Sequence, residues 1–236
     1  MMTELTLPII GYMHSSYKEK FGIPRQPNLV QVESYIEMLA PYNDVLAFEG
    51  IEAFSHLWLV WQFHDNKNPE KTQFRPQVRP PRLGGNKKIG VFATRSMYRP
   101  SPIGLSVVKL KCVKKEGKSV RVYVTGSDLL DGTPIVDIKP YIHYSDAVIN
   151  AESGYAQDEP KRKSVIWSDR AIEQKQQLLM SEKLSVQTAQ ELEAVLSLDP
   201  RPAYQDDEAR VYKMKFAAVD IAFTVGETTV NITAVE

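Results

Sequence analysis

The chain has 236 residues, of which 43% are hydrophobic and 25% charged, and its formal net charge at pH 7 is zero. This length is ample for a buried core, and the ordinary composition excludes a wholly disordered or collagen-like chain. The single cysteine, Cys112, excludes an internal disulfide and a zinc site built from several cysteines. No apolar run approaches the roughly 20 residues of a membrane span. The N-terminus lacks the pattern of a secretory signal, so we expect a cytoplasmic protein that does not bind membranes.

The first part of the chain is expected to be β-structure with long loops. Residues 5–13 predict a first strand broken by Gly11, and residues 22–28, with two prolines and a glycine, predict a loop. The unbroken apolar run of residues 56–63 predicts a central strand buried on both faces. Residues 65–85 contain four prolines and predict a long irregular loop, a kind of segment that is usually functional or disordered.

Further strands are predicted towards the middle of the chain. Residues 89–94 predict one of them, and residues 105–115 and 118–126 predict a hairpin around the turn Glu116-Gly117. Residues 134–138 predict a short strand. The polar residues from about 145 to 165 lack any periodicity and are interpreted as a linker.

The pattern then changes to helices followed by strands. Ser168 predicts an N-cap for a helix over residues 169–180, and residues 185–198 repeat the helical spacing. Residues 211–225 and 228–235 alternate around a Gly-Glu turn and predict a terminal hairpin. We therefore expect a mainly β domain at residues 1–150 and a small α+β domain at residues 165–236. The chain lacks the βαβ rhythm of a doubly wound nucleotide-binding sheet.

The charges are unevenly distributed. Residues 71–115 contain no Asp or Glu and 12 Lys or Arg, whereas the remainder has 17 basic and 29 acidic residues. Lysines on strand edges would explain part of this excess, but seven of the twelve lie in a stretch rich in Pro and Gly. We therefore interpret the segment as an anion-binding surface for phosphate or nucleic acid.

Familiar catalytic motifs are absent from the sequence. Gly85 to Gly90 has the glycine spacing of a phosphate-binding loop, but Val91 and Phe92 stand where Lys and Ser or Thr are required. His56 and His64 would lie about 26 Å apart along a straight strand, at ~3.3 Å per residue, too far to share one metal ion. We expect no metal site.

Four loop-like segments carry most of the polar chemistry: Arg25–Asn28, His64-Asp65, Arg95–Leu105 and Asp128–Pro134. The last could be a simple Asp-Gly turn, and the third a connection made rigid by prolines. Arg95 and Arg99, however, have no acidic residues nearby in the sequence, and the planar fork of arginine suits phosphate or carboxylate groups.

These segments resemble the TsaA-like family of tRNA methyltransferases, the TrmO group. The resemblance is carried by PRQPNLV at residues 24–30, EAFSHLWLVWQFH at 52–64, the run containing GVFATRS and RPSPIG at 78–110, LLDGTPIVDIKPY at 129–141 and DPRPAY at 199–204. It implies that a β-barrel, rather than a Rossmann sheet, holds S-adenosylmethionine. It also implies a homodimer that methylates N6 of threonylcarbamoyladenosine at position 37 of tRNA.

The resemblance assigns roles residue by residue. It implies cofactor contacts at Arg25, Gln26, Pro27, Asn28, His64, Asp65, Arg95, Leu105, Leu130, Asp131, Gly132 and Thr133. For the tRNA and its modified base, the acid-free stretch and the fork of arginine point to Arg82, Lys87, Lys88, Arg99 and Arg201, and the DPRPAY segment of the resemblance adds Tyr204.

The expected reaction is a single in-line displacement that requires no metal and depends mainly on positioning. His64 and Asp65 are candidates for the base that takes the N6 proton, although both could instead bind the donor. Arg99 or Arg201 would bind the threonyl carboxylate. Alternative hypotheses are a basic β-barrel that binds RNA without catalysis, and a methyltransferase for another adenosine-derived nucleotide. A metal-dependent hydrolase is disfavoured by the histidine spacing.

Overall fold

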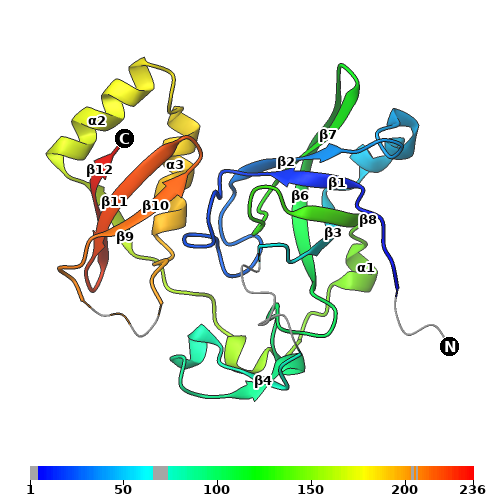
Figure 1. Ribbon diagram of the computed structural model, residues 1–236, viewed down its shortest axis with the longest axis horizontal. Helices are drawn as coiled ribbons and strands as arrows, with labels where there is room; N and C mark the ends of the chain where they lie inside the picture. The colour runs from blue at the N-terminus through cyan, green and yellow to red at the C-terminus, as the bar shows by residue number, and fades with distance from the viewer. Residues whose placement is uncertain (1–4, 66–73, 203–204, 206) are drawn as a thin grey trace.

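The computed structural model describes residues 5–65, 74–202, 205 and 207–236. These residues form a closed six-stranded barrel and a four-stranded sheet, which lie side by side in Figure 1. The prediction of a mainly β fold with a small α+β part is confirmed.

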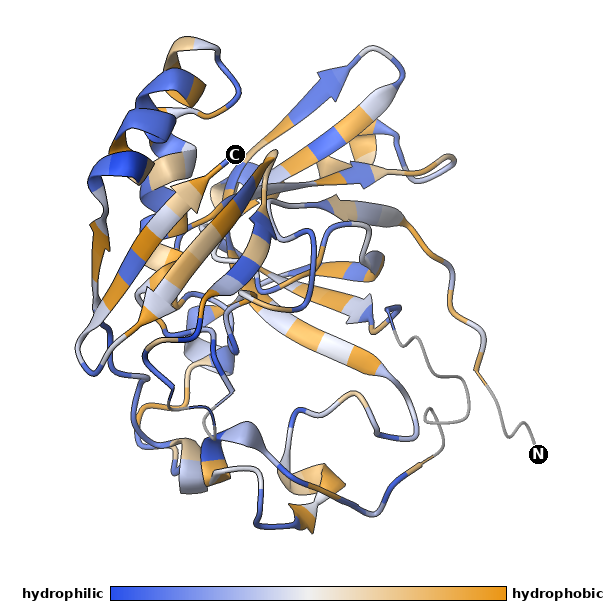
Figure 2. Cartoon of the chain, turned by 60° about the vertical axis from the view of Figure 1, so that its left-hand side comes forward, coloured by the Kyte–Doolittle hydropathy of each residue, from blue (hydrophilic) through white to orange (hydrophobic). Residues whose placement is uncertain are grey.

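The barrel strands follow one another in the order β1-β2-β7-β6-β3-β8, and each neighbouring pair is antiparallel. Closure leaves no free sheet edge. Residues alternate between the interior and the outer surface, which produces the alternating colour bands along the strands in Figure 2. The strands are β1 (Gly11–His14), β2 (Glu33–Met38), β3 (His56–Gln62), β6 (Ile103–Glu116), β7 (Ser119–Thr125) and β8 (Pro134–Pro140).

The predicted hairpin and the strands at residues 56–63 and 134–138 are confirmed as β6–β7, β3 and β8. The expectation that the strand at residues 56–63 is buried on both faces is wrong. Leu57, Leu59 and Trp61 point into the barrel, whereas Trp58 and Val60 between them are only half-buried. On the outer face of this strand, Trp58 contributes to the cavity described below.

The first strand is shorter and later than predicted, because β1 begins at Gly11 instead of being broken there. A Cβ at position 11 would lie 2.7 Å from the carbonyl oxygen of Glu37. Glycine therefore allows β1 and β2 to approach closely. Strand β2 was not predicted, although Ser34, Ile36 and Met38 alternate inwards.

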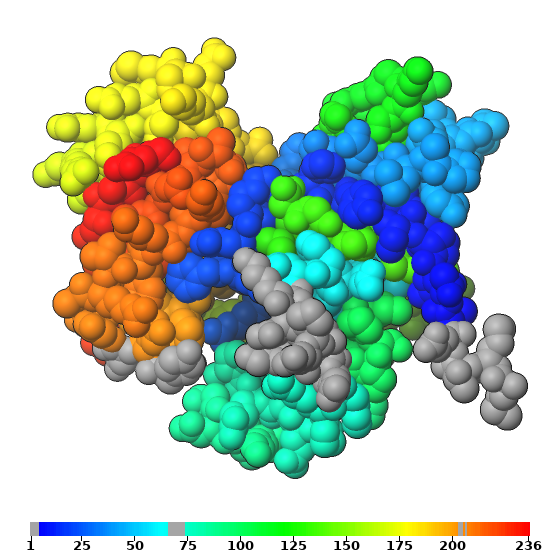
Figure 3. All heavy atoms as spheres, in the orientation of Figure 1, coloured from blue at the N-terminus to red at the C-terminus, as the bar shows by residue number. Residues whose placement is uncertain are grey.

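The loop predicted for residues 65–85 lies partly outside the described residues, and residues 74–100 contain little regular structure. They include the short pair β4 (Gln77–Val78) and β5 (Ile89–Gly90). The strand predicted for residues 89–94 is therefore wrong after its second residue, because Val91–Ala93 form a 3-10 turn. In Figure 3 this region protrudes as a separate lobe below the barrel.

The second sheet has the order β10-β11-β12-β9, with β9 and β12 parallel. Both predicted helices are confirmed. The hydroxyl of Ser168 accepts from the Ala171 N–H at 3.3 Å, and Ser185 caps the second helix through Thr188 at 2.9 Å. The elements are β9 (Ser164–Trp167), α2 (Asp169–Met180), α3 (Val186–Leu196), β10 (Tyr212–Phe216), β11 (Val219–Val225) and β12 (Thr229–Val235).

Two predictions for this part need correction. Residues 211–225 are two strands, not one, because Ala217 adopts a φ of 51° in a turn between β10 and β11. Residues 145–165 are not only a linker: the segment begins at the end of α1 (His143–Asp146) and ends in β9. A four-residue strand that pairs with a distant parallel partner leaves little periodicity to detect.

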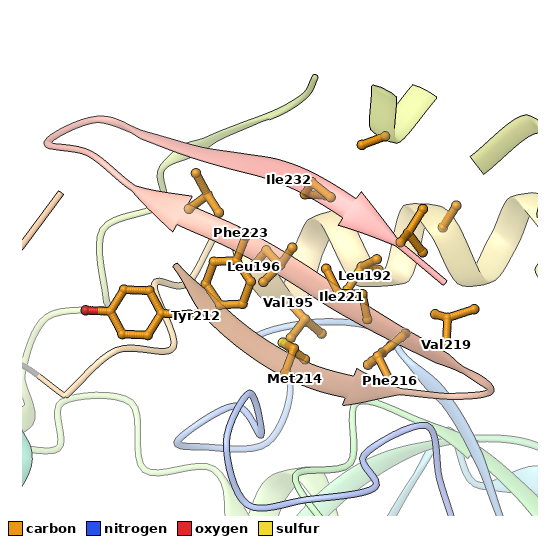
Figure 4. Packing of buried hydrophobic residues seen from close by; sticks show 14 of the residues in the cluster. Leu192, Val195, Leu196, Tyr212, Met214, Phe216, Val219, Ile221, Phe223 and Ile232 are labelled. Carbon is orange, nitrogen blue, oxygen red and sulfur yellow. The ribbon is translucent and has the colours of Figure 1, made fainter. Parts of the chain in front are cut away.

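The helices pack on one face of this sheet. Leu192, Val195 and Leu196 of α3 contact the buried side chains of β10 and β11, as Figure 4 shows. Tyr17 and Val32, from segments that flank the barrel strands, enter the same core. The barrel and the second sheet are therefore joined by a shared hydrophobic cluster.

Candidate active site at the mouth of the barrel

A cavity of about 490 Å³ opens where β3 ends and where β6 and β8 begin. Four separate segments of the chain line it: residues 20–26, 58–65, 94–105 and 128–133. Three of them lead into or out of barrel strands, so the barrel fixes the positions of their ends. The cavity thus brings together the four segments that the sequence marked as rich in polar chemistry.

One wall of the cavity is aromatic. The Trp61 and Phe63 rings lie 4.4 Å apart between centroids, and Trp61 packs over Gly104, where an added Cβ would lie 2.2 Å from the indole. Trp58 contributes a third ring, and its Nε1 donates to the Asp146 carboxylate of α1 at 2.9 Å. Rigid flat surfaces of this kind are suited to a nucleobase or another planar group.

Eight of the twelve predicted cofactor residues line the cavity: Arg25, Gln26, His64, Asp65, Arg95, Leu105, Leu130 and Thr133. Pro27, Asn28, Asp131 and Gly132 lie beside it and do not line it.

The contacts of these neighbouring residues are structural. Asn28 has a φ of 65°, and its side-chain nitrogen donates to the Val107 carbonyl at 2.9 Å. The Asp131 carboxylate accepts from the Ser15 N–H at 2.9 Å and pairs with Lys18 at 2.9 Å. Both residues therefore fix the loops whose other members form the cavity wall.

The cationic side chains of the cavity are held by neighbouring oxygens. Arg95 donates to the Gln26 side-chain oxygen at 2.5 Å, and Arg99 donates to the Thr94 carbonyl at 2.9 Å. Arg25 donates to the carbonyl oxygen of Arg201 at 3.1 Å, which ties the cavity to the second sheet. Each guanidinium keeps further N–H groups for a ligand.

His64 and Asp65 lie side by side at the cavity rim. Burial lowers the pKa of the His64 imidazole below its ordinary value, and Lys20 acts in the same direction while Asp65 opposes it. The imidazole is therefore neutral at pH 7 and able to accept a proton. Asp65 pairs with Lys20 at 3.5 Å.

Several cavity residues were not predicted. Asp128 lines the cavity, as do Lys20, Trp58, Trp61, Phe63 and Met97. The aromatic residues lie in a strand whose apolar run was interpreted only as core. Asp128 lies in a segment that was identified as polar, but no spacing indicated that its side chain faces the cavity.

The predicted tRNA contacts are dispersed. Arg99 lines the cavity, whereas Lys87 and Lys88 are exposed on the protruding lobe and Arg82 donates to the Asp158 carbonyl. Arg201 is only 7% exposed and forms a two-point ion pair with Asp199, with both N–O distances 2.9 Å. Tyr204 lies outside the described residues.

Other site classes find no support in the described residues. Within residues 5–65, 74–202, 205 and 207–236, no three His, Cys, Asp or Glu side chains gather as a metal site would require. Among the helices of this part of the chain, none has both the length and the apolar character needed to span a bilayer.

Comparison with known proteins identifies the family. Residues 12–147 match the tRNA-methyltransferase O N-terminal domain, and residues 160–236 match the TrmO C-terminal domain. A tRNA (adenine(37)-N6)-methyltransferase of Escherichia coli (strain K12) is 45% identical over 208 residues, which cover 88% of this chain and 86% of that protein. One of the same name from Eikenella corrodens is 42% identical, covering 78% of this chain and 97% of its own length.

A solved structure agrees with the sequence matches. The crystal structure of TrmO from Pseudomonas aeruginosa has a TM-score of 0.79 and 34% identity, and the alignment covers 100% of this chain and 99% of that one. The matches extend over both the barrel and the second sheet, so the chain belongs to the tRNA-methyltransferase O family.

Proposed function

We propose that the protein transfers a methyl group from S-adenosylmethionine to N6 of threonylcarbamoyladenosine at position 37 of tRNA. The observation that carries this proposal is the barrel-mouth cavity, which gathers eight predicted cofactor residues from four distant segments. Residues 1–150 would form the donor-binding domain, and residues 165–236 a small domain that supports it. The similarity to relatives that act on adenine 37 of tRNA supports the same reaction.

The cavity fits the proposed donor. Its volume of about 490 Å³ lies within the usual range for a small-molecule site. The aromatic wall offers a surface for the adenine ring, and Arg25 and Arg95 offer N–H groups for the methionine carboxylate. When bound, S-adenosylmethionine supplies an activated methyl group on a sulfonium, a leaving group that needs no metal.

The residues of the chain then have to position the acceptor and remove one proton. Orientation alone can contribute several kcal/mol to catalysis, up to about 10 in favourable cases. N6 of the modified base is attached to a carbonyl, which makes its proton more acidic than that of plain adenosine. The neutral His64 imidazole is suited to accept this proton. Asp65 is the alternative base, and its carboxylate is paired with Lys20.

The tRNA would approach along the basic region. Arg99 faces the cavity and is the candidate for the threonyl carboxylate. Lys87 and Lys88 are exposed on the lobe and would contact anticodon-loop phosphates, as would Arg82. Binding should then weaken steeply with salt, because phosphate contacts release counterions.

Arg201 is better explained as a positioning residue than as a substrate ligand. Its guanidinium is buried against Asp199 and also donates to the Val225 carbonyl at 3.4 Å. This leaves little capacity for a carboxylate of the substrate, whereas the backbone oxygen of Arg201 holds Arg25 at the cavity.

A homodimer fits the distribution of exposed apolar side chains. Leu105 lines the cavity and is 52% exposed, and Tyr144 in α1 and Val148 and Ile149 after it are between 72% and 90% exposed. Large exposed apolar side chains are frequent at protein interfaces. A partner subunit placed there would close one side of the cavity. We expect the protein to act in the cytoplasm, where tRNA is available.

The decisive experiment is mass analysis of tRNA nucleosides after incubation with S-adenosylmethionine. The proposal expects one added methyl on N6 of the threonylcarbamoylated adenosine and none on tRNA that lacks this modification. Methyl on another adenosine would retain the enzyme class and change the substrate.

Thermal unfolding separates the enzyme from an RNA-binding protein without catalysis. S-adenosylmethionine should raise the Tm of the protein, since any ligand that binds only the folded state stabilises it. A Tm that does not respond to the donor would favour the RNA-binding alternative.

The role of His64 is tested by His64→Ala. If His64 is the base, turnover falls by about 10² to 10⁴ while donor affinity is retained. Full turnover in this variant would eliminate His64 and leave Asp65 as the candidate.

A further inference from the structure

Asp128 lines the cavity, but the roles proposed above do not use it. Its Oδ1 accepts a hydrogen bond from the Ser106 hydroxyl at 2.6 Å, and Ser106 Oγ accepts one from Trp61 Nε1 at 3.0 Å. Because an indole nitrogen can only donate, the proton of the hydroxyl must point towards Asp128. Trp61 and Ser106 therefore fix the carboxyl group from behind.

The other oxygen of Asp128 remains available to the cavity. Among the residues that the structure describes, Ser106 is the one whose side chain donates a hydrogen bond to the Asp128 carboxylate, and none forms an ion pair with Asp128. Asp65, the other cavity carboxylate, is paired with Lys20 at 3.5 Å. Burial raises the pKa of Asp128, while the Ser106 hydroxyl, the backbone N–H of Asp128 and the charge of Arg95 oppose the shift. A half-buried carboxylate without a nearby cation lowers the stability of the ligand-free protein and is suited to bind a cationic ligand.

Resting on the proposed function, we propose that Asp128 is the counter-ion of the donor sulfonium, so that the cavity prefers the charged donor over its neutral thioether product. The donor also carries an ammonium and ribose hydroxyls. These are hydrogen-bond donors, each of which needs its own acceptors.

The surroundings of Asp128 favour the sulfonium over those groups. Trp61 and Ile103 present apolar side chains to the cavity, and the Thr133 hydroxyl already donates to the Leu130 carbonyl at 2.6 Å. A sulfonium has no N–H or O–H and needs only a nearby negative charge and weakly polar walls. Aromatic rings add to the attraction for a cation.

This arrangement has a consequence for turnover. Transfer breaks the S–C bond, leaves its electron pair on sulfur and forms the N6–C bond, while the N6 proton passes to the base. The sulfur is neutral afterwards, so Asp128 loses its partner when the methyl group moves. The product is then bound more weakly than the donor, which favours its replacement.

The test compares two ligands that differ only in the methyl group and the charge. Calorimetric titration of the protein with S-adenosylmethionine and with S-adenosylhomocysteine gives both Kd values. For Asp128→Asn we expect the Kd of the charged donor to rise about tenfold or more, as for loss of a close charge pair. The Kd of the thioether should change less than about twofold, because its sulfur carries no charge to lose.

Asp65→Asn is the matched control, since it removes the other carboxylate of the same cavity. It should change both Kd values by the same factor. A selective loss of the charged donor in this variant as well would overturn the assignment to Asp128.

The remaining outcomes are distinct. Wild-type protein that binds neither ligand would refute the proposed function itself. Wild-type binding with an equal loss of both ligands in Asp128→Asn, or with no loss, would overturn only the counter-ion proposal. If Asp128→Asn fails to fold, Ser106→Ala is the variant to test. It removes the hydroxyl that holds Oδ1, so the Asp128 carboxylate is no longer fixed and the ratio of the two Kd values should shift away from the charged donor. An unchanged ratio would overturn the proposal.

Discussion

The second sheet and the barrel mouth use their side chains in opposite ways. Under α2 and α3, apolar residues fill the interior, and Phe223 is fully buried and packs against Phe21 and Tyr212. At the barrel mouth, polar and charged groups from four segments face an open cavity, and Asp128 has no cationic partner among the described residues. The first region stabilises the fold, whereas the second holds groups that become favourable only when a ligand arrives.

The two regions also depend on each other. The Asp199–Arg201 ion pair lies beside the second sheet, yet its backbone holds Arg25 at the cavity. A well-packed small domain can thus position a residue in the binding site without contacting the ligand itself.

The largest expected effect is on the free energy of unfolding, when a phenylalanine is replaced by alanine at a filled and at an exposed position. Phe223→Ala should lower the free energy of unfolding by about 3–5 kcal/mol, because it leaves a cavity in a filled core. Phe92, in the lobe below the barrel, is 71% exposed, so Phe92→Ala should change the free energy of unfolding by less than about 0.5 kcal/mol. Denaturant unfolding measures both. Similar losses in the two variants would break the proposed division between the regions.

A smaller effect is expected where the barrel mouth is tightly packed. Gly104→Ala would place a Cβ 2.2 Å from the Trp61 ring, and displacing this ring should cost about 1–3 kcal/mol and weaken donor binding. Gly90→Ala is the control, since nothing lies within 4 Å of its added Cβ and its φ is −58°. Unfolding and donor titration should leave the control close to wild type. Normal donor affinity in Gly104→Ala would show that the Trp61 wall does not form the site.

The lysines of the lobe should affect the binding of tRNA and not the binding of the donor. Replacing Lys87 and Lys88 together by Ala should weaken tRNA binding by about tenfold and reduce the slope of log affinity against log salt by about 1.5 to 2. Donor affinity should not change, because neither residue lines the cavity. Lys175→Ala is the control, since Lys175 lies in α2 and pairs with Glu193 of α3 at 3.1 Å. A salt slope that is unchanged in the double variant would remove the lobe from the tRNA interface.

The smallest expected effect is a gain, not a loss, in folding stability. Burial raises the pKa of Asp128 in the folded protein above its unfolded value, so the ionised group opposes folding at neutral pH. Asp128→Asn should therefore stabilise the ligand-free protein at pH 7, by about 0.5–1 kcal/mol. The gain should disappear as the pH falls below the ordinary pKa of aspartate, where the carboxyl is protonated in both states.

Thermal unfolding at pH 7 and near pH 3 measures this difference. Asp220→Asn, on the exposed face of β11, serves as the control and should alter stability little at either pH. A loss of stability in Asp128→Asn at pH 7 would show that its charge supports the fold and is not held for a ligand.

The sequence by itself determined the elements whose pattern is local. Ser168 and Ser185 mark the starts of the two helices, and Glu116-Gly117 marks the turn of the long hairpin, because capping and turn formation depend on residues close together in the chain. Family resemblance supplied the predicted cofactor residues, most of which line one cavity.

Tertiary structure decided what depends on distant partners. Strand β9 exists because it pairs with β12, and Gly11 lies within a strand because β2 approaches it closely. The direction in which Asp128 points follows from Ser106 and Trp61 on neighbouring strands. Ser106 lies 22 positions from Asp128 in the sequence and Trp61 lies 67 positions from it, so no local pattern could predict this arrangement. Closure of the barrel brings these residues together, and it is a property of the whole sheet.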